Sequence, residues 1–182
     1  MLKKIAILLF CCTATRAVNP ISTERIALTS TPNTENVREN TVDSTAVIPL
    51  QTTGDDIVNT ARKYLGKRYR FGHRGPNAFD CSGFTSYIYE QEGVRIGRSS
   101  RDQFREGEKI SIPDLRKGDL VFFGRGGSKH HINHVGIVTE VDPDKGRFNF
   151  IHACSRGVAI DTYPDIKYYV SRYVSARRIL PD

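Results

Sequence analysis

The amino-acid sequence predicts an α+β domain in which N-terminal helices pack on an antiparallel β-sheet. Segments with apolar residues at helical spacing occur early in the folded part, within residues 55–92. Segments rich in β-branched and aromatic residues follow only after residue 118, separated by short turns. Helices that precede the strands, instead of alternating with them, indicate this class.

The first helix is expected within residues 55–66, "DDIVNTARKYLG". Asp55 or Asp56 is the expected N-cap, because a carboxylate there accepts hydrogen bonds from free backbone N–H groups. Gly66 is the expected end of the helix.

The second helix is expected from about Cys81 to Glu92. Asp80 is its expected N-cap, and Gly93 follows its end. The buried stripe is predicted from helical spacing to contain Phe84, Tyr87, Ile88 and Gln91.

Five strands are expected in the second half of the chain. Each is a short run of β-branched and aromatic residues bounded by turn residues. They lie at 119–124, 134–141, 147–154, 157–163 and 171–179. The turn "DPDKG" at 142–146 makes the second and third of these a hairpin.

Residues 1–17 are typical of a signal peptide and predict export. Lys3 and Lys4 precede the apolar run 5–10, and small residues follow up to Ala17. A first core helix is the alternative, disfavoured because polar sequence follows at once. "LLFCC" also resembles the lipobox of bacterial lipoproteins. Cys12 is the better candidate for lipidation, and lipidation would attach the protein to a membrane surface. Soluble export remains the alternative.

Residues 18–53 are expected to form a disordered tether, and residues 54–182 the folded domain. Between residues 19 and 53, 18 of 35 residues are Ser, Thr, Asn or Pro, and none is aromatic. Such a segment buries too little apolar surface to offset the entropy lost on ordering.

The chain is basic, with a net charge of +7 and a pI of about 9.4. This charge favours polyanionic surroundings. The basic residues do not form a stripe interleaved with stacking aromatic residues, so nucleic acid is not an expected partner.

Cys81 is a candidate nucleophile because it lies in the first turn of the second helix. The helix dipole and the free N–H groups there lower a thiol pKa, so Cys81 is predicted to ionise below the ordinary value of about 8.5. The same N–H groups can stabilise an oxyanion. On its own such a position is more often occupied by a cysteine that is a small buried apolar residue.

The hairpin at 134–154 brings two histidines together. If its turn is centred near Pro143 and Asp144, paired residue numbers sum to about 286–288, and His134 faces the region of His152 to Cys154. One imidazole can then act as a base while the other orients it. An ordinary cross-strand polar pair is the alternative.

"HHINH" at 130–134 also permits a metal site, since three imidazoles lie within five residues. Zinc sites need a second ligand cluster on ordered elements, and His130 and His131 lie in a glycine-rich basic loop. We therefore expect no metal and no other cofactor.

Five ordered blocks now identify a family resemblance: "FDCSGFTSYIY", "RSSRDQ", "LRKGDLVFF", "HVGIV" and "FIHACSRGV". They resemble the NlpC family of bacterial cell-wall cysteine endopeptidases over residues 54–180. The resemblance implies a papain-like fold, in which the helix of the nucleophile packs against an antiparallel sheet that carries the histidines.

By this resemblance, Cys81 is the nucleophile, His134 the base and His152 the third, orienting residue. The residues implied to line the substrate site are Tyr69, Asp80, Ser82, Ser99 and Ser100. Among these, Asp80 and Ser82 resemble the pair that recognises the free amine of a stem-peptide L-Ala. The chain departs from the family at His73, where a glycine is frequent, and Cys154 has no assigned role.

The implied function is hydrolysis of peptidoglycan stem peptides, between D-γ-glutamyl and a diamino acid such as meso-diaminopimelate. The alternatives are a catalytically silent wall-binding module and an acyltransferase on the same fold. The expected partners are peptidoglycan or muropeptides. We expect a monomer, exported to the periplasm or anchored to a membrane as a lipoprotein.

Overall fold

The computed structural model describes residues 51–128 and 131–181. The predicted signal peptide, Cys12 and the tether up to residue 50 lie outside the described residues, as does His130. Within the described residues, no helix has both the length and the apolar composition needed to cross a membrane.

Helix α1, Gly54–Arg62, begins one residue earlier than predicted and has a different N-cap. The Thr53 hydroxyl accepts a hydrogen bond from the Asp56 backbone N–H, and the Asp56 carboxylate accepts one from the Thr53 N–H. This reciprocal capping box satisfies two free donors at once. The prediction of Asp55 or Asp56 as N-cap was therefore wrong. The helix ends at Arg62, and Gly66 (φ 76°) lies in the turn that follows.

Helix α2, Cys81–Gln91, has the predicted N-cap: the Asp80 carboxylate accepts a hydrogen bond from the Gly83 N–H. Its predicted stripe was partly wrong, because Gln91 is exposed and Tyr89 is fully buried. The reason is that α2 is covered on more than one side. The loop before it also packs on it, as the 3.1 Å hydrogen bond from Arg74 Nε to Ser86 Oγ shows.

All neighbouring strands of the main sheet are antiparallel. In spatial order they are β3 (Glu108–Ile110), β8 (Tyr173–Arg178), β4 (Leu120–Gly124), β5 (Ile132–Asp142), β6 (Arg147–Cys154) and β7 (Gly157–Tyr163). The five predicted strands are confirmed, and β3 was missed. The structure thus has the predicted α+β class.

Several short elements were not predicted, because each is too short to show a period. They are the parallel pair β1 (Arg68–Tyr69) and β2 (Ala78–Phe79), the helices α3 (Ser100–Gln103) and α4 (Lys167–Val170), and three 3₁₀ turns: η1 (Ile112–Asp114), η2 (Arg125–Gly127) and η4 (Pro143–Lys145).

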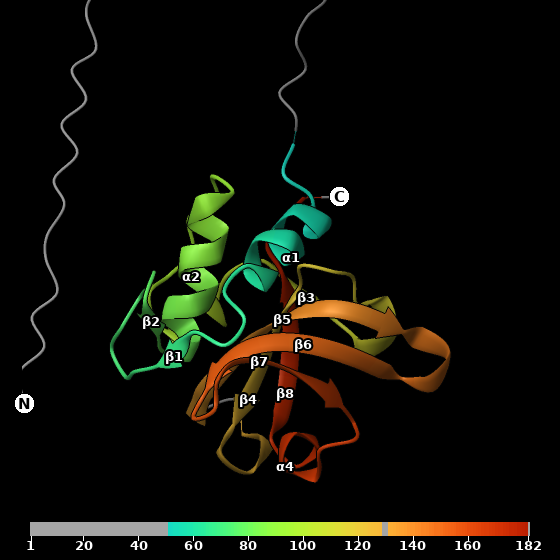
Figure 1. The fold of residues 1–182 in the computed structure, drawn as a ribbon. Coiled ribbons are helices and arrows are strands. Elements are labelled where there is room, and N and C mark those ends of the chain that lie inside the picture. Colours follow the sequence, from blue (N-terminus) through green and yellow to red (C-terminus); the bar gives the residue numbers. More distant parts are fainter. Residues whose placement is uncertain (1–50, 129–130, 182) are drawn as a thin grey trace, which may run out of the picture. The chain divides into compact units, whose positions relative to one another are not determined.

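The sheet has an apolar cluster on each face, and the helices α1 and α2 cover one face only (Figure 1). The helix-side cluster includes Ile57, Phe84, Ile88, Phe122, Val135, Ile137 and Ile151. The far-side cluster includes Val121, Phe123, Val138, Phe148, Phe150 and Tyr169 of α4. Because side chains alternate along a strand, a shift of one residue exchanges these two environments.

A bulge in β5 sets the register of the β5–β6 hairpin. Asp142 pairs with Arg147 next to the turn, so the numbers sum to 289, whereas Ile137 pairs with Ile151 and the sum is 288. Thr139 is the extra residue between these two parts of the ladder. Next to the turn the sum is one above the predicted range of 286–288, and beyond the bulge it falls within that range. The predicted neighbourhood of His134 and His152 therefore holds.

Candidate active site

Cys81 lies at the first residue of α2, against the backbone of β5. Its sulfur is 3.9 Å from the carbonyl oxygen of Asn133. Backbone N–H groups of Ser82, Val135 and Cys81 itself also face the sulfur and lower its pKa. The thiol thus contacts the backbone of the residues immediately before and after His134. Backbone N–H groups that are suited to stabilising an oxyanion surround it.

The structure contradicts the predicted low pKa of Cys81. Burial raises the pKa of this thiol, and the neighbouring Asp80 charge raises it further, against the backbone N–H groups that lower it. The sequence pattern showed the favourable helix position but not the extent of burial. Cys81 is therefore a neutral thiol at pH 7.

The imidazoles of His134 and His152 meet on the far-side face of the sheet. Nε2 of His134 is 2.7 Å from Nδ1 of His152, and the two rings are almost perpendicular. Tyr169 stacks on His134 and meets His152 edge-on. Helix α2 packs on the opposite face of this sheet. Cys81 instead reaches the β5 backbone at the N-terminal end of its helix.

His134 is uncharged in this surrounding. Burial lowers the pKa of His134 to about 3, and the neighbouring His152 contributes in the same direction, while Asp161 opposes them. A neutral imidazole keeps a lone pair on one ring nitrogen and can accept a proton there.

Asp161 completes a chain of polar side chains that the sequence analysis missed. His152 is fully buried, and its Nε2 is 2.9 Å from Oδ2 of Asp161. Arg156 donates to both oxygens of Asp161 at 2.7 Å. A signal existed: in the β6–β7 hairpin His152 pairs with Ala159, which puts Asp161 diagonally beside it on the same face.

Gly136 provides the space for His152. A Cβ at Gly136 would lie 2.7 Å from Cδ2 of Phe150 and 3.2 Å from Cβ of His152. Any larger residue would therefore push the His152 imidazole or the Phe150 ring away. The segment "HVGI" thus contains both His134 and the glycine that leaves space for His152.

Asp80 and Ser82, the predicted amine-binding pair, are already engaged with Arg98. The guanidinium donates to Asp80 Oδ2 at 2.8 Å, to Asp80 Oδ1 at 3.1 Å and to Ser82 Oγ at 3.2 Å. Gly72 N–H also donates to Asp80. Burial opposes these contacts, but together they hold the pKa of Asp80 below its usual value. The Asp80 carboxylate thus already has a cationic partner.

The other predicted substrate residues are less closely assembled. Tyr69 is 39% exposed, and its pKa is raised by burial first and then by Cys81, Asp80 and Cys154, which all lie near its hydroxyl. Ser99 is the N-cap of α3 and hydrogen-bonds Asp102, whereas Ser100 is buried.

The structure gives local roles to His73 and Cys154. The His73 side chain is exposed, and its carbonyl accepts a 2.8 Å hydrogen bond from Asp80 N–H, at the start of α2. Cys154 is a free thiol whose sulfur is 3.4 Å from the Gly157 carbonyl oxygen.

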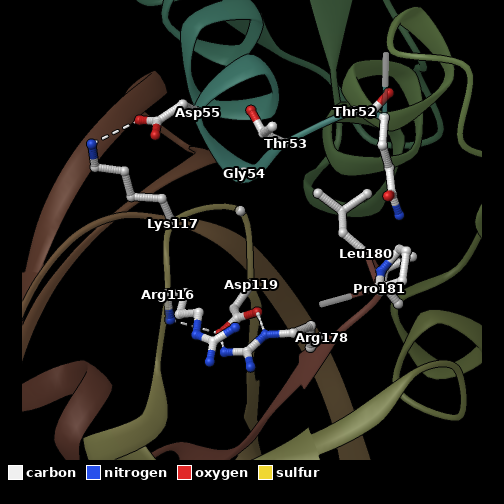
Figure 2. Close-up of a pocket in the computed structure, with 13 residues that line it drawn as sticks. Thr52, Thr53, Gly54, Asp55, Arg116, Lys117, Asp119, Arg178, Leu180 and Pro181 are labelled. Carbon is white, nitrogen blue, oxygen red and sulfur yellow. Dashed lines mark hydrogen bonds and ion pairs between the residues drawn. The ribbon is translucent and has the colours of Figure 1, made fainter. Parts of the chain in front are cut away.

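A cavity of about 440 Å³ lies where the chain enters and leaves the domain, between Thr53 and Pro181 (Figure 2). Lys117 pairs with Asp55 at its rim, and Arg178 pairs with Asp119. Neither Cys81 nor His134 lines it, so it is separate from the candidate active site.

The sequence matches the profile of the NlpC/P60 family over residues 66–178. It is 41% identical over 132 residues to the probable endopeptidase p60 of Listeria grayi, covering 72% of this chain and 23% of that protein. It is 35% identical over 128 residues to the gamma-D-glutamyl-L-lysine dipeptidyl-peptidase of Bacillus cereus, covering 70% of this chain and 37% of that protein. The chain thus spans less than half the length of these two relatives.

Solved structures give the same result. A crystal structure of an NlpC/P60 family protein from Bacillus cereus matches with a TM-score of 0.62 and 33% identity, over 72% of this chain and 41% of that chain. The NlpC/p60 domain of the peptidoglycan hydrolase SagA matches with a TM-score of 0.57 and 33% identity, over 70% of this chain and 99% of that chain. The resemblance noted in the sequence is confirmed: this chain belongs to the NlpC/P60 family.

Proposed function

We propose that this chain is a cysteine endopeptidase that hydrolyses peptidoglycan stem peptides, at the bond between a D-γ-glutamyl residue and a diamino acid such as meso-diaminopimelate. The observation that carries the proposal is the position of the Cys81 thiol against the strand that bears the His134–His152 pair. The names of the relatives support the substrate class, since one is a gamma-D-glutamyl-L-lysine dipeptidyl-peptidase and another a peptidoglycan hydrolase.

In the proposed reaction, His134 takes the proton of Cys81 as the sulfur attacks the scissile carbonyl carbon. The negative charge that develops on the carbonyl oxygen is stabilised by backbone N–H groups at the start of α2, with the Tyr69 hydroxyl nearby. The C–N bond then breaks, and His134 gives its proton to the leaving amine. Water attacks the resulting thioester, transfers a proton to His134 and releases the acyl product, after which Cys81 regains its proton.

The raised pKa of Cys81 and the lowered pKa of His134 define the protonation states in which the reaction starts. Both groups are neutral at pH 7, so proton transfer accompanies attack instead of preceding it. Alkylation of Cys81 by iodoacetamide should accelerate with pH to beyond about 8.5, the pKa of an ordinary cysteine. A rate that is already maximal at pH 7 would show a preformed thiolate and contradict this state.

Substrate binding is assigned to Tyr69, Asp80, Ser82, Ser99 and Ser100 as part of the proposal. Asp80 and Ser82 would meet the L-Ala end of the stem peptide together with Arg98, which already bridges them. An arginine at this end favours a stem whose L-Ala nitrogen is in amide linkage, since such a nitrogen brings no competing charge.

The family and the N-terminal sequence support a proposal for where the enzyme acts. A wall-associated location agrees with family membership. We further propose export through the signal peptide at residues 1–17, with lipidation at Cys12 as the means of membrane attachment. Mass analysis of the mature N-terminus from cells would show a diacylated cysteine, or a free N-terminus near residue 18 if export is soluble.

The deciding experiment digests defined muropeptides with the full chain and reads the products by mass. Release of the fragment that begins with the diamino acid is expected, with loss of activity in Cys81→Ala by at least about 1,000-fold. His131→Ala is the matched control for His134→Ala, because His131 is exposed on the loop that precedes β5. Unchanged hydrolysis by Cys81→Ala would overturn the proposal, and products transferred to an added amine instead of water would identify an acyltransferase.

A further inference from the structure

We propose that Asp161, held by Arg156, is a positioning residue that fixes the tautomers of both histidines and so leaves Nδ1 of His134 as the proton acceptor. The inference rests on the proposed function for its catalytic consequence. Its structural part concerns only where the protons lie in the free protein.

The first step is the charge of Asp161. The hydrogen bond from His152 and the ion pair with Arg156 hold the pKa of Asp161 well below its usual range, although burial acts against them. The side chain is 6% exposed and Arg156 contacts both of its oxygens. An ionised carboxylate can only accept hydrogen bonds.

The second step carries this constraint through the two rings. Because Asp161 only accepts, Nε2 of His152 must carry the proton of their 2.9 Å hydrogen bond. In a neutral imidazole Nδ1 is then the acceptor, so the 2.7 Å contact requires Nε2 of His134 to donate. Nδ1 of His134 keeps its lone pair.

The third step is the arrangement of residues that keeps these protons on the assigned nitrogens. Three adjacent strands each supply one member: His134 from β5, His152 from β6 and Asp161 from β7. Tyr169 covers both rings and also lies against Asp161, and the other charged or titratable groups near these three side chains are Arg156 and Cys154. His152 has no exposed surface through which water could exchange the roles of its two nitrogens.

Asp161→Asn is the sharpest variant, because it preserves shape and removes only the charge. Arg156 donates to both oxygens and His152 donates to Oδ2, so the new amide sets its NH₂ group against Arg156 in either orientation and can present either its oxygen or its NH₂ group to His152. Where the NH₂ group faces His152, Nε2 of His152 accepts, and both histidines are then protonated on Nδ1. In that form the base for Cys81 is lost without loss of the fold.

The test measures tautomers and kinetics separately. In the unchanged full chain, ¹⁵N imidazole chemical shifts are expected to show His134 and His152 protonated on Nε2; protonation of either on Nδ1 would overturn the proposal. In Asp161→Asn a second set of shifts, with both rings protonated on Nδ1, should appear, and kcat should fall in proportion to that population while KM stays within about twofold. Asp144→Asn, in the exposed turn before β6, is the matched control and should change neither.

Each outcome decides the question. A fall in kcat without a change of tautomer would make Asp161 a structural residue only, and a change of tautomer without a fall in kcat would remove its catalytic consequence; either result overturns the proposal. If Asp161→Asn does not fold, the spectrum of the unchanged protein still decides. If the proposed function is wrong, no stem peptide will be cleaved. The spectra of the protein without substrate would still show which nitrogens are protonated.

Discussion

Asp80 and Asp161 are two buried carboxylates that serve different ends. Each is 6% exposed, and each accepts hydrogen bonds from an arginine whose side chain reaches solvent, 43% exposed for Arg98 and 61% for Arg156. Asp80 also accepts from the backbone N–H groups of Gly72 and Gly83. Asp161 accepts instead from an imidazole.

The difference shows that the kind of hydrogen-bond donor beside a buried carboxylate determines which property the carboxylate affects. A backbone N–H keeps its proton in any state, so Asp80 acts on the stability of α2 and its preceding loop. An imidazole has two nitrogens that can exchange roles, so Asp161 acts on proton positions. The following experiments separate these two effects.

The largest effect is expected from Gly136→Ala, which disturbs the contact between His152 and Asp161 without changing any charged group. The new methyl group would collide with Phe150 and press on His152, so His152 would move from between His134 and Asp161. We expect kcat to fall at least about 100-fold and stability to fall by about 1–3 kcal/mol. Muropeptide digestion and urea unfolding measure the two changes, and a kcat within threefold of the unchanged protein would contradict the tight packing.

Asp80→Ala should test the other member of the pair through stability. It removes the N-cap of α2 and leaves Gly72 and Gly83 N–H groups without their acceptor. The free energy of unfolding, measured in urea, should fall by about 2 kcal/mol. Asp144→Ala is the matched surface control and should change it by less than about 0.5 kcal/mol. Equal losses in the two variants would show that the cap contributes nothing.

The pH dependence of stability should distinguish the histidine from both carboxylates. The pKa of His134 is lowered to about 3, so as pH falls below about 6.5 the unfolded chain takes up a proton that the folded protein does not. Stability should therefore drop between pH 7 and pH 5. The lowered pKa values of Asp80 and Asp161 act only at lower pH, because their contribution is present above about 4 and is lost below it.

Urea midpoints at pH 7 and pH 5 measure the histidine contribution. His134→Gln should show a smaller drop than the unchanged protein, whereas His131→Gln, at an exposed position, should show the same drop as the unchanged protein. An identical drop in all three proteins would assign the acid sensitivity to other groups.

The smallest effects are expected from the two arginines, because both are partly exposed and screened by solvent. Arg156→Gln should lower kcat by about three- to tenfold with KM unchanged. Arg98→Gln should leave kcat unchanged and lower KM for stem peptides with a free L-Ala amine by about threefold, since Asp80 then lacks its cationic partner. Kinetics on matched free and N-acetylated stems measure both changes. If both variants altered the same parameter, the two carboxylates would not be functionally distinct.

The sequence was sufficient where local rules act. The period of apolar residues and the turn residues predicted β6 and β7 with the bounds that the structure shows. Asp80 was recognised as an N-cap because its side chain bonds the helix that directly follows it. The pairing of His134 with His152 was predicted because one hairpin joins their strands.

The parts that could not be predicted depend on distant contacts. Burial of Cys81 results from β5 lying against α2, far away in the chain, and this reverses the direction of its pKa. Tyr169, which covers the histidine pair, lies on a helix of four residues that has no detectable period. The pairing of residue numbers that predicted the His134–His152 contact could also have found Asp161 in the β6–β7 hairpin. Asp161 was missed because only the β5–β6 hairpin was considered.

The bulge at Thr139 also has a consequence for how the hairpin tolerates changes of length. Strand β5 carries one residue of slack between the turn and His134, whereas β6 pairs residue for residue from Arg147 to Ile151. Deletion of Thr139 can be absorbed by straightening β5, with His134 still beside His152. Deletion of one residue between Arg147 and His152 would rotate every later side chain of β6 to the opposite face. Related sequences and deletion libraries should therefore vary in length on the β5 arm and stay constant on the β6 arm.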